Sequence, residues 1–125
     1  MDILISNSSN KPIYEQITDQ LKNLIITGTL AQGDALPSMR LLAKELRISV
    51  ITTKRAYEDL ERDGFIETVA GKGSFVARQN LQLIREHYLR QTEEQLIKAV
   101  RLAKNSAISR DELMEMILLL YQEEA

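Results

Sequence analysis

The chain of 125 residues contains no cysteine and a single histidine. Without cysteine, disulfide frameworks, thiolate metal sites and cysteine nucleophiles are excluded, and a reducing compartment is permitted. The sequence also has no glycine-rich phosphate loop ending in Lys-Ser/Thr and no metal-ligand spacing, so it lacks the residues for a catalytic site. We therefore predict that the protein is not an enzyme and uses no metal or cofactor.

Long apolar runs are also missing. No stretch reaches the roughly 18 apolar residues that cross a bilayer, and residues 1–10 lack the basic and apolar regions of a signal peptide. The composition, 44% hydrophobic and 27% charged, is typical of a folded chain and not of a disordered one. We expect a cytoplasmic protein that does not contact membranes.

An excess of positive charge is absent as well. The formal net charge is -2, and residues 1–78 contain ten Lys or Arg and ten Asp or Glu, against six and eight in residues 79–125. A neutral first part exerts no global attraction on phosphate groups. Binding to nucleic acid would therefore depend on the local placement of cations.

Helical periodicity is present in the first part of the chain. Apolar residues recur at helical spacing from Ile13 to Ile25, and Pro12 and Gly28 bound this pattern. Glycine, aspartate and proline in residues 28–37 predict a loop with a short extended piece near its end. Ser38 then has the position of an N-cap for a short second helix.

A third helix is predicted after a tight turn, with Ser49 as its N-cap. At about 100° per residue this helix has two distinct faces. The predicted core face contains Thr53, Ala56, Tyr57 and Leu60. The opposite, free face contains Ile51, Arg55, Glu58 and Arg62.

A hairpin is predicted next, because residues 65–69 and 74–77 are rich in β-branched and aromatic types and flank a turn at residues 70–73. Two tightly joined helices followed by a hairpin indicate a winged helix-turn-helix. A B-DNA major groove, about 12 Å wide, accepts the third helix, and the hairpin tip reaches a minor groove. Ser49 to Arg55 would then offer hydroxyls, N–H groups and two cations to the major groove, and Lys72 a cation to the minor groove.

The tail is predicted to form two helices. The first spans about residues 81–104, and Ser109 with Glu112 is a capping box for the second. Between Leu113 and Tyr121 only Glu115 is polar, and one neighbouring helix cannot cover a helix that is apolar on nearly every side. A second copy of the chain is the simplest cover. The predicted dimerisation residues are Leu113, Met114, Ile117, Leu118 and Tyr121.

The expected fold is therefore mainly α with a small β wing. A winged helix-turn-helix DNA-binding domain would occupy residues 1–78, and a two-helix dimerisation tail would occupy residues 79–125. Gln82, Arg85 and His87 are candidates for an effector or metal site in the tail. A lone histidine without cysteines or an acidic cluster is more typical of a surface residue, so we predict no metal there.

Several motifs match a known family in order along the chain. They are Leu36-Pro37-Ser38-Met39-Arg40-Leu41-Leu42-Ala43, residues 46–49, Ala56-Tyr57, Leu60, Gly64-Phe65-Ile66 and Gly71-Lys72-Gly73-Ser74-Phe75-Val76. Over roughly residues 10–78 the chain resembles the GntR family of bacterial regulators. The short tail resembles the YtrA-like branch, which lacks a large effector domain. The resemblance implies DNA contacts at Arg40, Ser49, Thr52, Lys54 and Gly71.

One position departs from that pattern. Where many family members have arginine after the capping residue, this chain has Val50, followed by Ile51. A branched apolar side chain can contact a thymine methyl group, but it cannot make the bidentate guanine contact of arginine. The base preference of arginine-bearing relatives therefore does not transfer to this chain.

Most of these residues also have a purely structural interpretation. Arg40, Lys54 and Arg55 resemble solvated helix charges, and acidic residues one turn further on can pair with the last two. Ser49 caps its helix in either case, and Gly71 is equally suited to a turn that only closes the hairpin. DNA contact is the interpretation that the resemblance favours.

Together these patterns predict a sequence-specific DNA-binding transcription regulator. We expect a repressor that acts as a homodimer on a two-fold symmetric operator in double-stranded DNA. The alternative is a winged-helix protein-interaction module without DNA binding, which the near-neutral charge allows. A strong salt dependence of duplex binding would distinguish the two. A small-molecule effector is permitted, but no residue identifies one.

Overall fold

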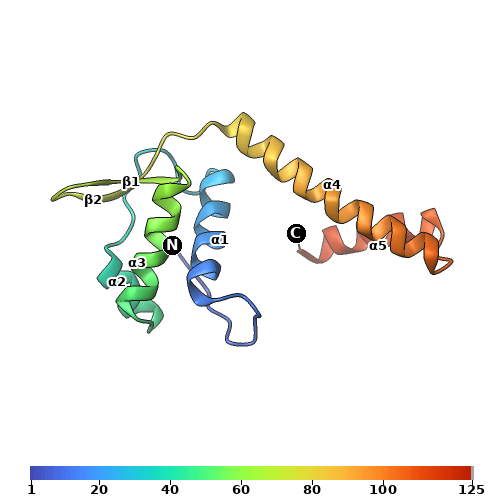
Figure 1. The fold of residues 1–125 in the computed structure, drawn as a ribbon, viewed down its shortest axis with the longest axis horizontal. Helices are drawn as coiled ribbons and strands as arrows, with labels where there is room; N and C mark the ends of the chain where they lie inside the picture. The colour runs from blue at the N-terminus through green and yellow to red at the C-terminus, as the bar shows by residue number, and fades with distance from the viewer. Residues whose placement is uncertain (125) are drawn as a thin grey trace. The chain divides into compact units, whose positions relative to one another are not determined.

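The computed structural model describes residues 1–124, apart from the side chains of residues 83 and 124 (Figure 1). The described chain is mainly helical with one two-stranded antiparallel sheet. It divides into one compact unit, Met1–Leu81, and a second that begins at Gln82. In the described range, no helix combines the length and apolar character needed to span a bilayer.

The first helix of the first unit is α1 (Ile13–Ile26). Ile17, Leu21 and Ile25 are buried, which confirms the face predicted from the spacing. Pro12, predicted to bound the helix, is its N-cap: its φ of -55° suits a helix, but its ψ of 153° is extended. Gly28 ends the segment at a φ of +83°.

An unpredicted feature of this unit is the anchoring of the N-terminal segment along α1. The side-chain amide of Gln20 accepts a bond from Leu4 N and donates one to Leu4 O, at 2.9 and 2.7 Å. One turn earlier, Gln16 accepts from Ser6 N and donates to Ser6 O. The two glutamines thus satisfy backbone groups of an extended segment, which lets Ile3 pack with only 7% of its surface exposed.

The helix-turn-helix consists of α2 (Met39–Leu46) and α3 (Val50–Arg62). Both predicted N-caps are confirmed: the hydroxyl of Ser38 accepts a bond from Leu41 N, and that of Ser49 accepts one from Thr52 N. Between the helices, Arg47 adopts the left-handed conformation at φ +57°. This conformation reverses the chain within a few residues.

The core of the first unit is built around α3. Its predicted inner face is almost completely buried, with exposed fractions of 0–1% for Thr53, Ala56, Tyr57 and Leu60. The Tyr57 hydroxyl donates a 2.7 Å hydrogen bond to Pro37 O, immediately before the N-cap of α2. Burial, reinforced by the negative charge of Glu45, raises the pKa of the Tyr57 phenol above its ordinary value, so the hydroxyl stays a donor at neutral pH.

The wing is the hairpin of β1 (Ile66–Val69) and β2 (Gly73–Val76), which projects from the three helices in Figure 1. Its register runs from Ile66 opposite Val76 to Val69 opposite Gly73. The extended piece predicted before α2 forms a bridge from Ala35 to Phe75, and Leu36 N donates to Ser74 O at 2.9 Å. The segment that precedes α2 is therefore bonded to the wing, and the predicted fold class is confirmed.

The second unit contains α4 (Leu81–Asn105), except for its first residue, and α5 (Arg110–Glu124). Ala107, at φ +57°, lies in the turn between the helices, and the Ser109 hydroxyl accepts a bond from Glu112 N, as the capping box predicts. The carboxylate of Glu112 accepts a bond from the same hydroxyl at 3.1 Å. Ala103 of α4 is buried, but most apolar residues of α5 are exposed within the single chain.

Candidate nucleic-acid interface

The N-terminal end of α3 positions the predicted groove contacts. The hydroxyl of Ser49 accepts from Thr52 N at 3.0 Å and is bonded to the hydroxyl of Thr52 at 2.8 Å. The capping role of Ser49 is thus confirmed, and its DNA contact stays a prediction. Because Thr52 is tied to the cap, its side chain has a defined orientation at the start of the helix.

Two apolar side chains are exposed at the same end of α3. Val50 exposes 45% of its surface and Ile51 exposes 81%. Leaving a large aliphatic side chain in water forgoes the stabilisation of roughly 1.5–3 kcal/mol that full burial provides. Ile51 therefore contributes almost nothing to the core of the chain that carries it.

The cations of α3 have different surroundings. Lys54 lies 3.9 Å from the carboxylate of Glu58, one turn along the helix, and both are well exposed, so the pair is weak. Arg62 pairs with Asp59 at 3.1 Å and with Asp63 at 3.4 Å. Acidic partners for Lys54 were expected, and Glu58 is confirmed as one.

Arg55 instead contacts an aromatic residue of α1. Its guanidinium carbon lies 3.8 Å from the centre of the Tyr14 ring, and Nη2 donates a 3.1 Å hydrogen bond to the Tyr14 hydroxyl. Tyr14 was not predicted from the sequence, because this contact joins residues that are 41 positions apart. No local pattern gives a signal for such a pair.

Arg40 is exposed in the first turn of α2. Lys44, in the last turn of α2, and Arg47, at its C-cap, are exposed too and were not among the predicted contacts. Exposed cations therefore occur at both ends of α2 as well as on α3. Exposed acidic residues, Glu45 on α2 and Glu58 on α3, lie on the same helices.

The wing tip contains a three-residue loop, Ala70 to Lys72, in which Lys72 N donates to Val69 O at 2.9 Å. Gly71 and Gly73 have φ values of +77° and +112°, where side chains other than hydrogen are strained. No atom lies within 4 Å of a Cβ built on either glycine. Glycine is thus required here by backbone conformation, and Lys72 is exposed between the two.

The predicted dimerisation residues lie on α5. Met114, Ile117, Leu118 and Tyr121 expose 54%, 37%, 63% and 79% of their surfaces, and Leu113 is half-buried. Leu119 and Leu120 are also more than half exposed. The exposed apolar surface of α5 is therefore broader than the five residues chosen from the sequence.

The candidate effector or metal site on α4, Gln82, Arg85 and His87, is not supported by the contacts of these side chains. Gln82 donates to Glu86 at 3.3 Å, and the His87 ring packs edge-on against Tyr88 at 5.3 Å. Among the described residues, no group of three or more His, Cys, Asp or Glu is placed to hold a metal ion.

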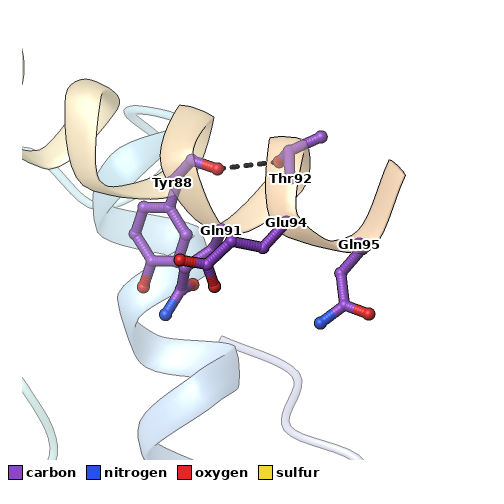
Figure 2. A pocket seen from close by; sticks show the side chains of 5 residues that line it. All are labelled: Tyr88, Gln91, Thr92, Glu94 and Gln95. Atoms are coloured by element: carbon purple, nitrogen blue, oxygen red, sulfur yellow. Dashed lines mark hydrogen bonds between the residues drawn. The ribbon is translucent and has the colours of Figure 1, made fainter. Parts of the chain in front are cut away.

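A shallow hollow lies further along α4. It is lined by exposed side chains of this one helix: Tyr88, Gln91, Thr92, Glu94 and Gln95. Figure 2 shows the Thr92 hydroxyl bonded to the Tyr88 carbonyl oxygen, at 2.7 Å. Small-molecule sites usually bury about 70–90% of their ligand. One exposed helix face cannot do this, so the hollow supplies no argument for an effector.

Comparison with known proteins identifies the family. The family described as "Bacterial regulatory proteins, gntR family" matches residues 13–76, which run from the start of α1 to the end of β2. The chain belongs to the GntR family. It is 36% identical over 115 residues, covering 92% of this chain and 88% of the relative, to the "HTH-type transcriptional repressor YtrA" of Bacillus subtilis (strain 168). The resemblance predicted from the motifs is thereby confirmed.

Solved structures agree with this assignment. A GntR family transcriptional regulator from Listeria monocytogenes is 30% identical and superposes with a TM-score of 0.72, covering 90% of this chain and 96% of that one. The structure of AraR(DBD) in complex with operator ORX1 covers 62% of this chain and 96% of its own, with 25% identity and a TM-score of 0.55. The chain is a winged-helix transcription regulator and not an enzyme.

Proposed function

We propose that this GntR-family chain binds operator DNA as a homodimer in the cytoplasm and represses transcription. In this proposal α3 enters the major groove, the wing reaches the adjacent minor groove, and the second unit joins two copies. The operator complex of AraR(DBD) and the repressor name of the Bacillus subtilis relative support the proposal by similarity.

The observation that carries the proposal is the contrast between the two faces of α3. The inner face is 0–1% exposed, whereas Ile51 on the outer face is 81% exposed and Arg55, Glu58 and Arg62 are exposed as well. A helix that is fixed on one side and free on the other, at the end of a helix-turn-helix, has the geometry that inserts into a major groove.

Phosphate contacts would come from Arg40 and Lys54. Arg40 is exposed on α2, and the pair of Lys54 with Glu58 is long enough to be exchanged for a phosphate at little cost. Phosphate contacts fix the orientation of a protein on the duplex without selecting a sequence. Lys72, exposed at the glycine-flanked wing tip, would enter the minor groove, where negative potential is concentrated at A·T pairs.

Base selection would depend on Ser49, Thr52 and the apolar pair. Val50 and Ile51 are exposed and cannot accept or donate hydrogen bonds through their side chains, so the feature of a base edge that suits them is the thymine methyl group. We therefore expect A·T pairs in each half-site where these side chains lie. Hydroxyls of Ser49 and Thr52 contact base edges or phosphates at the same end of the helix.

Dimerisation would use α5. Leu118 and Tyr121 are exposed in the single chain, and a second copy would remove this apolar surface from water. A two-fold symmetric dimer matches a two-fold symmetric operator, whose half-sites lie about 34–36 Å apart or a multiple of this distance.

Selection of duplexes from a random pool by the full chain tests the proposal. We expect enrichment of an inverted repeat, binding of two chains per duplex, and affinity that falls steeply with salt. The variant Lys54→Ala should flatten the log-log salt slope by about 0.9 per chain, and Lys98→Ala on α4 serves as a matched control that leaves the slope unchanged. No enrichment together with salt-independent, weak binding would favour the protein-interaction alternative.

The selected duplex then tests base selection. Replacing a contacted thymine by uracil removes only its methyl group. If Ile51 contacts that methyl, the wild type should lose affinity on the uracil duplex, whereas Ile51→Ala should bind both duplexes equally. Equal binding of the wild type to every uracil-substituted duplex would contradict this part of the proposal.

A further inference from the structure

Arg55 differs from the other two cations of α3. Lys54 has a carboxylate at 3.9 Å and Arg62 has carboxylates at 3.1 and 3.4 Å. Within the part of the chain that the structure describes, Arg55 has no ion-pair partner, and its contacts are the ring and hydroxyl of Tyr14. A tyrosine ring attracts a cation but does not neutralise its charge.

The contact with Tyr14 positions the guanidinium of Arg55 and engages only part of its hydrogen-bonding capacity. The guanidinium carbon lies over the ring, 3.8 Å from its centre, and Nη2 donates to the Tyr14 hydroxyl. Arginine has five N–H donors, so most of them remain for an anion. The forked arrangement of these donors suits the oxygens of a phosphate.

We infer that Tyr14 is a positioning residue that keeps the Arg55 side chain in a conformation suited to contact a phosphate of the DNA backbone. This inference rests on the proposed DNA binding of α3 and adds a residue of α1 to it. Tyr14 lies in the first turn of α1, so a contact made by Arg55 couples α1 to the helix that enters the groove.

The contact with Tyr14 reduces the conformational entropy that Arg55 loses on binding. Immobilising a long side chain at an interface costs about 0.5–1.5 kcal/mol, which corresponds to roughly 2- to 12-fold in affinity. In the free protein the contact with Tyr14 already restricts the side chain. Removing the ring should therefore lower DNA affinity by about this factor while Arg55 still reaches its phosphate.

The test measures binding of the full chain to mixed-sequence duplex DNA across a salt series. Arg55→Ala should weaken binding and flatten the log-log salt slope by about 0.9 per chain. Tyr14→Leu should weaken binding about 2- to 12-fold with the slope unchanged. Adding Tyr14→Leu to Arg55→Ala should cause no further loss, because the residue that it positions is absent. Tyr14→Phe keeps the ring and should recover most of the affinity.

A purely structural role makes different predictions. Suppose that the pair only stabilises the packing of α1 against α3. Tyr14→Leu then lowers the melting temperature and weakens DNA binding equally with and without Arg55. Arg55→Ala then leaves the salt slope unchanged. Either result overturns the inference. Should Tyr14→Leu fail to fold, Arg55→Ala and Arg55→Lys still test the phosphate contact on which the inference depends, and unchanged binding and slope in both would refute the inference.

The failure of this inference is distinguishable from that of the proposed function. If the wild type binds duplex DNA with a steep salt dependence but Arg55→Ala does so equally, α3 binds DNA without the Tyr14–Arg55 pair. If the wild type shows no salt-dependent binding, the proposed function itself is wrong.

Discussion

Replacing Tyr57 by phenylalanine removes one buried hydroxyl and leaves the aromatic ring. Tyr57 is 1% exposed, and its hydroxyl donates at 2.7 Å to the carbonyl oxygen of Pro37. A buried acceptor that loses its donor costs about 1–3 kcal/mol. In a unit of this size each kcal/mol lowers the melting temperature by roughly 4–8 °C, so we expect Tyr57→Phe to melt about 4–24 °C below the wild type.

Thermal unfolding followed by circular dichroism measures this shift. Tyr88→Phe is the matched control, because Tyr88 is 38% exposed and its ring contact with His87 survives the change. The pH dependence gives a second readout. Burial raises the folded-state pKa of Tyr57, so its stabilising contribution is present below pH 10 and is lost as pH rises above this value. Tyr57→Phe should lack that alkaline loss, and a melting temperature equal to that of Tyr88→Phe would refute the reasoning.

Three further changes test the wing, the tail and the packing of α1. Lys72→Ala should weaken binding to duplexes with A·T pairs beside the half-site, while the melting temperature of the protein stays unchanged. Unchanged affinity would show that the wing is only a structural hairpin. Leu118→Glu should give a monomer by analytical ultracentrifugation, because burying an unpaired carboxylate in an interface costs several kcal/mol; a persisting dimer would place the interface elsewhere. Burial opposes ionisation of Asp63. The hydrogen bonds and charges of Lys22, at 3.0 Å, and Arg62, at 3.4 Å, together outweigh burial and hold the pKa of Asp63 below its ordinary value of 3.8. Its contribution to stability is thus present above about pH 3.8 and lost on further acidification, a loss that Asp63→Asn should not show in acid titration.

Features determined by neighbouring residues could be predicted from the sequence. Ser38 and Ser49 cap α2 and α3 because a serine hydroxyl bonds the N–H three residues later, which is a local rule. The buried face of α3 follows from its spacing alone, and Gly71 marks the wing turn because its φ of +77° favours glycine.

Contacts between distant segments could not be predicted. The bonds of Gln16 and Gln20 to the N-terminal segment, and the contact of Arg55 with Tyr14, join residues 10 to 41 positions apart through side chains that can rotate freely in the unfolded chain. The conformation of Arg47 was not predicted either, because glycine is the usual residue for the left-handed end of a helix. Exposure of the candidate groove residues agrees with the expectation from spacing, and their contact with DNA stays a prediction.

Binding of the full chain to its selected duplex, measured as a function of salt concentration and with the stoichiometry determined, tests the central proposal most directly. Arg40, Lys54 and Arg55 from each of two chains would place six cations on phosphates. At roughly 0.9 per contact, the slope of log affinity against log salt should then be about -5. We predict two chains per duplex and a slope near this value. A single chain per duplex, or a slope near zero, would contradict the proposal of a dimeric DNA-binding regulator.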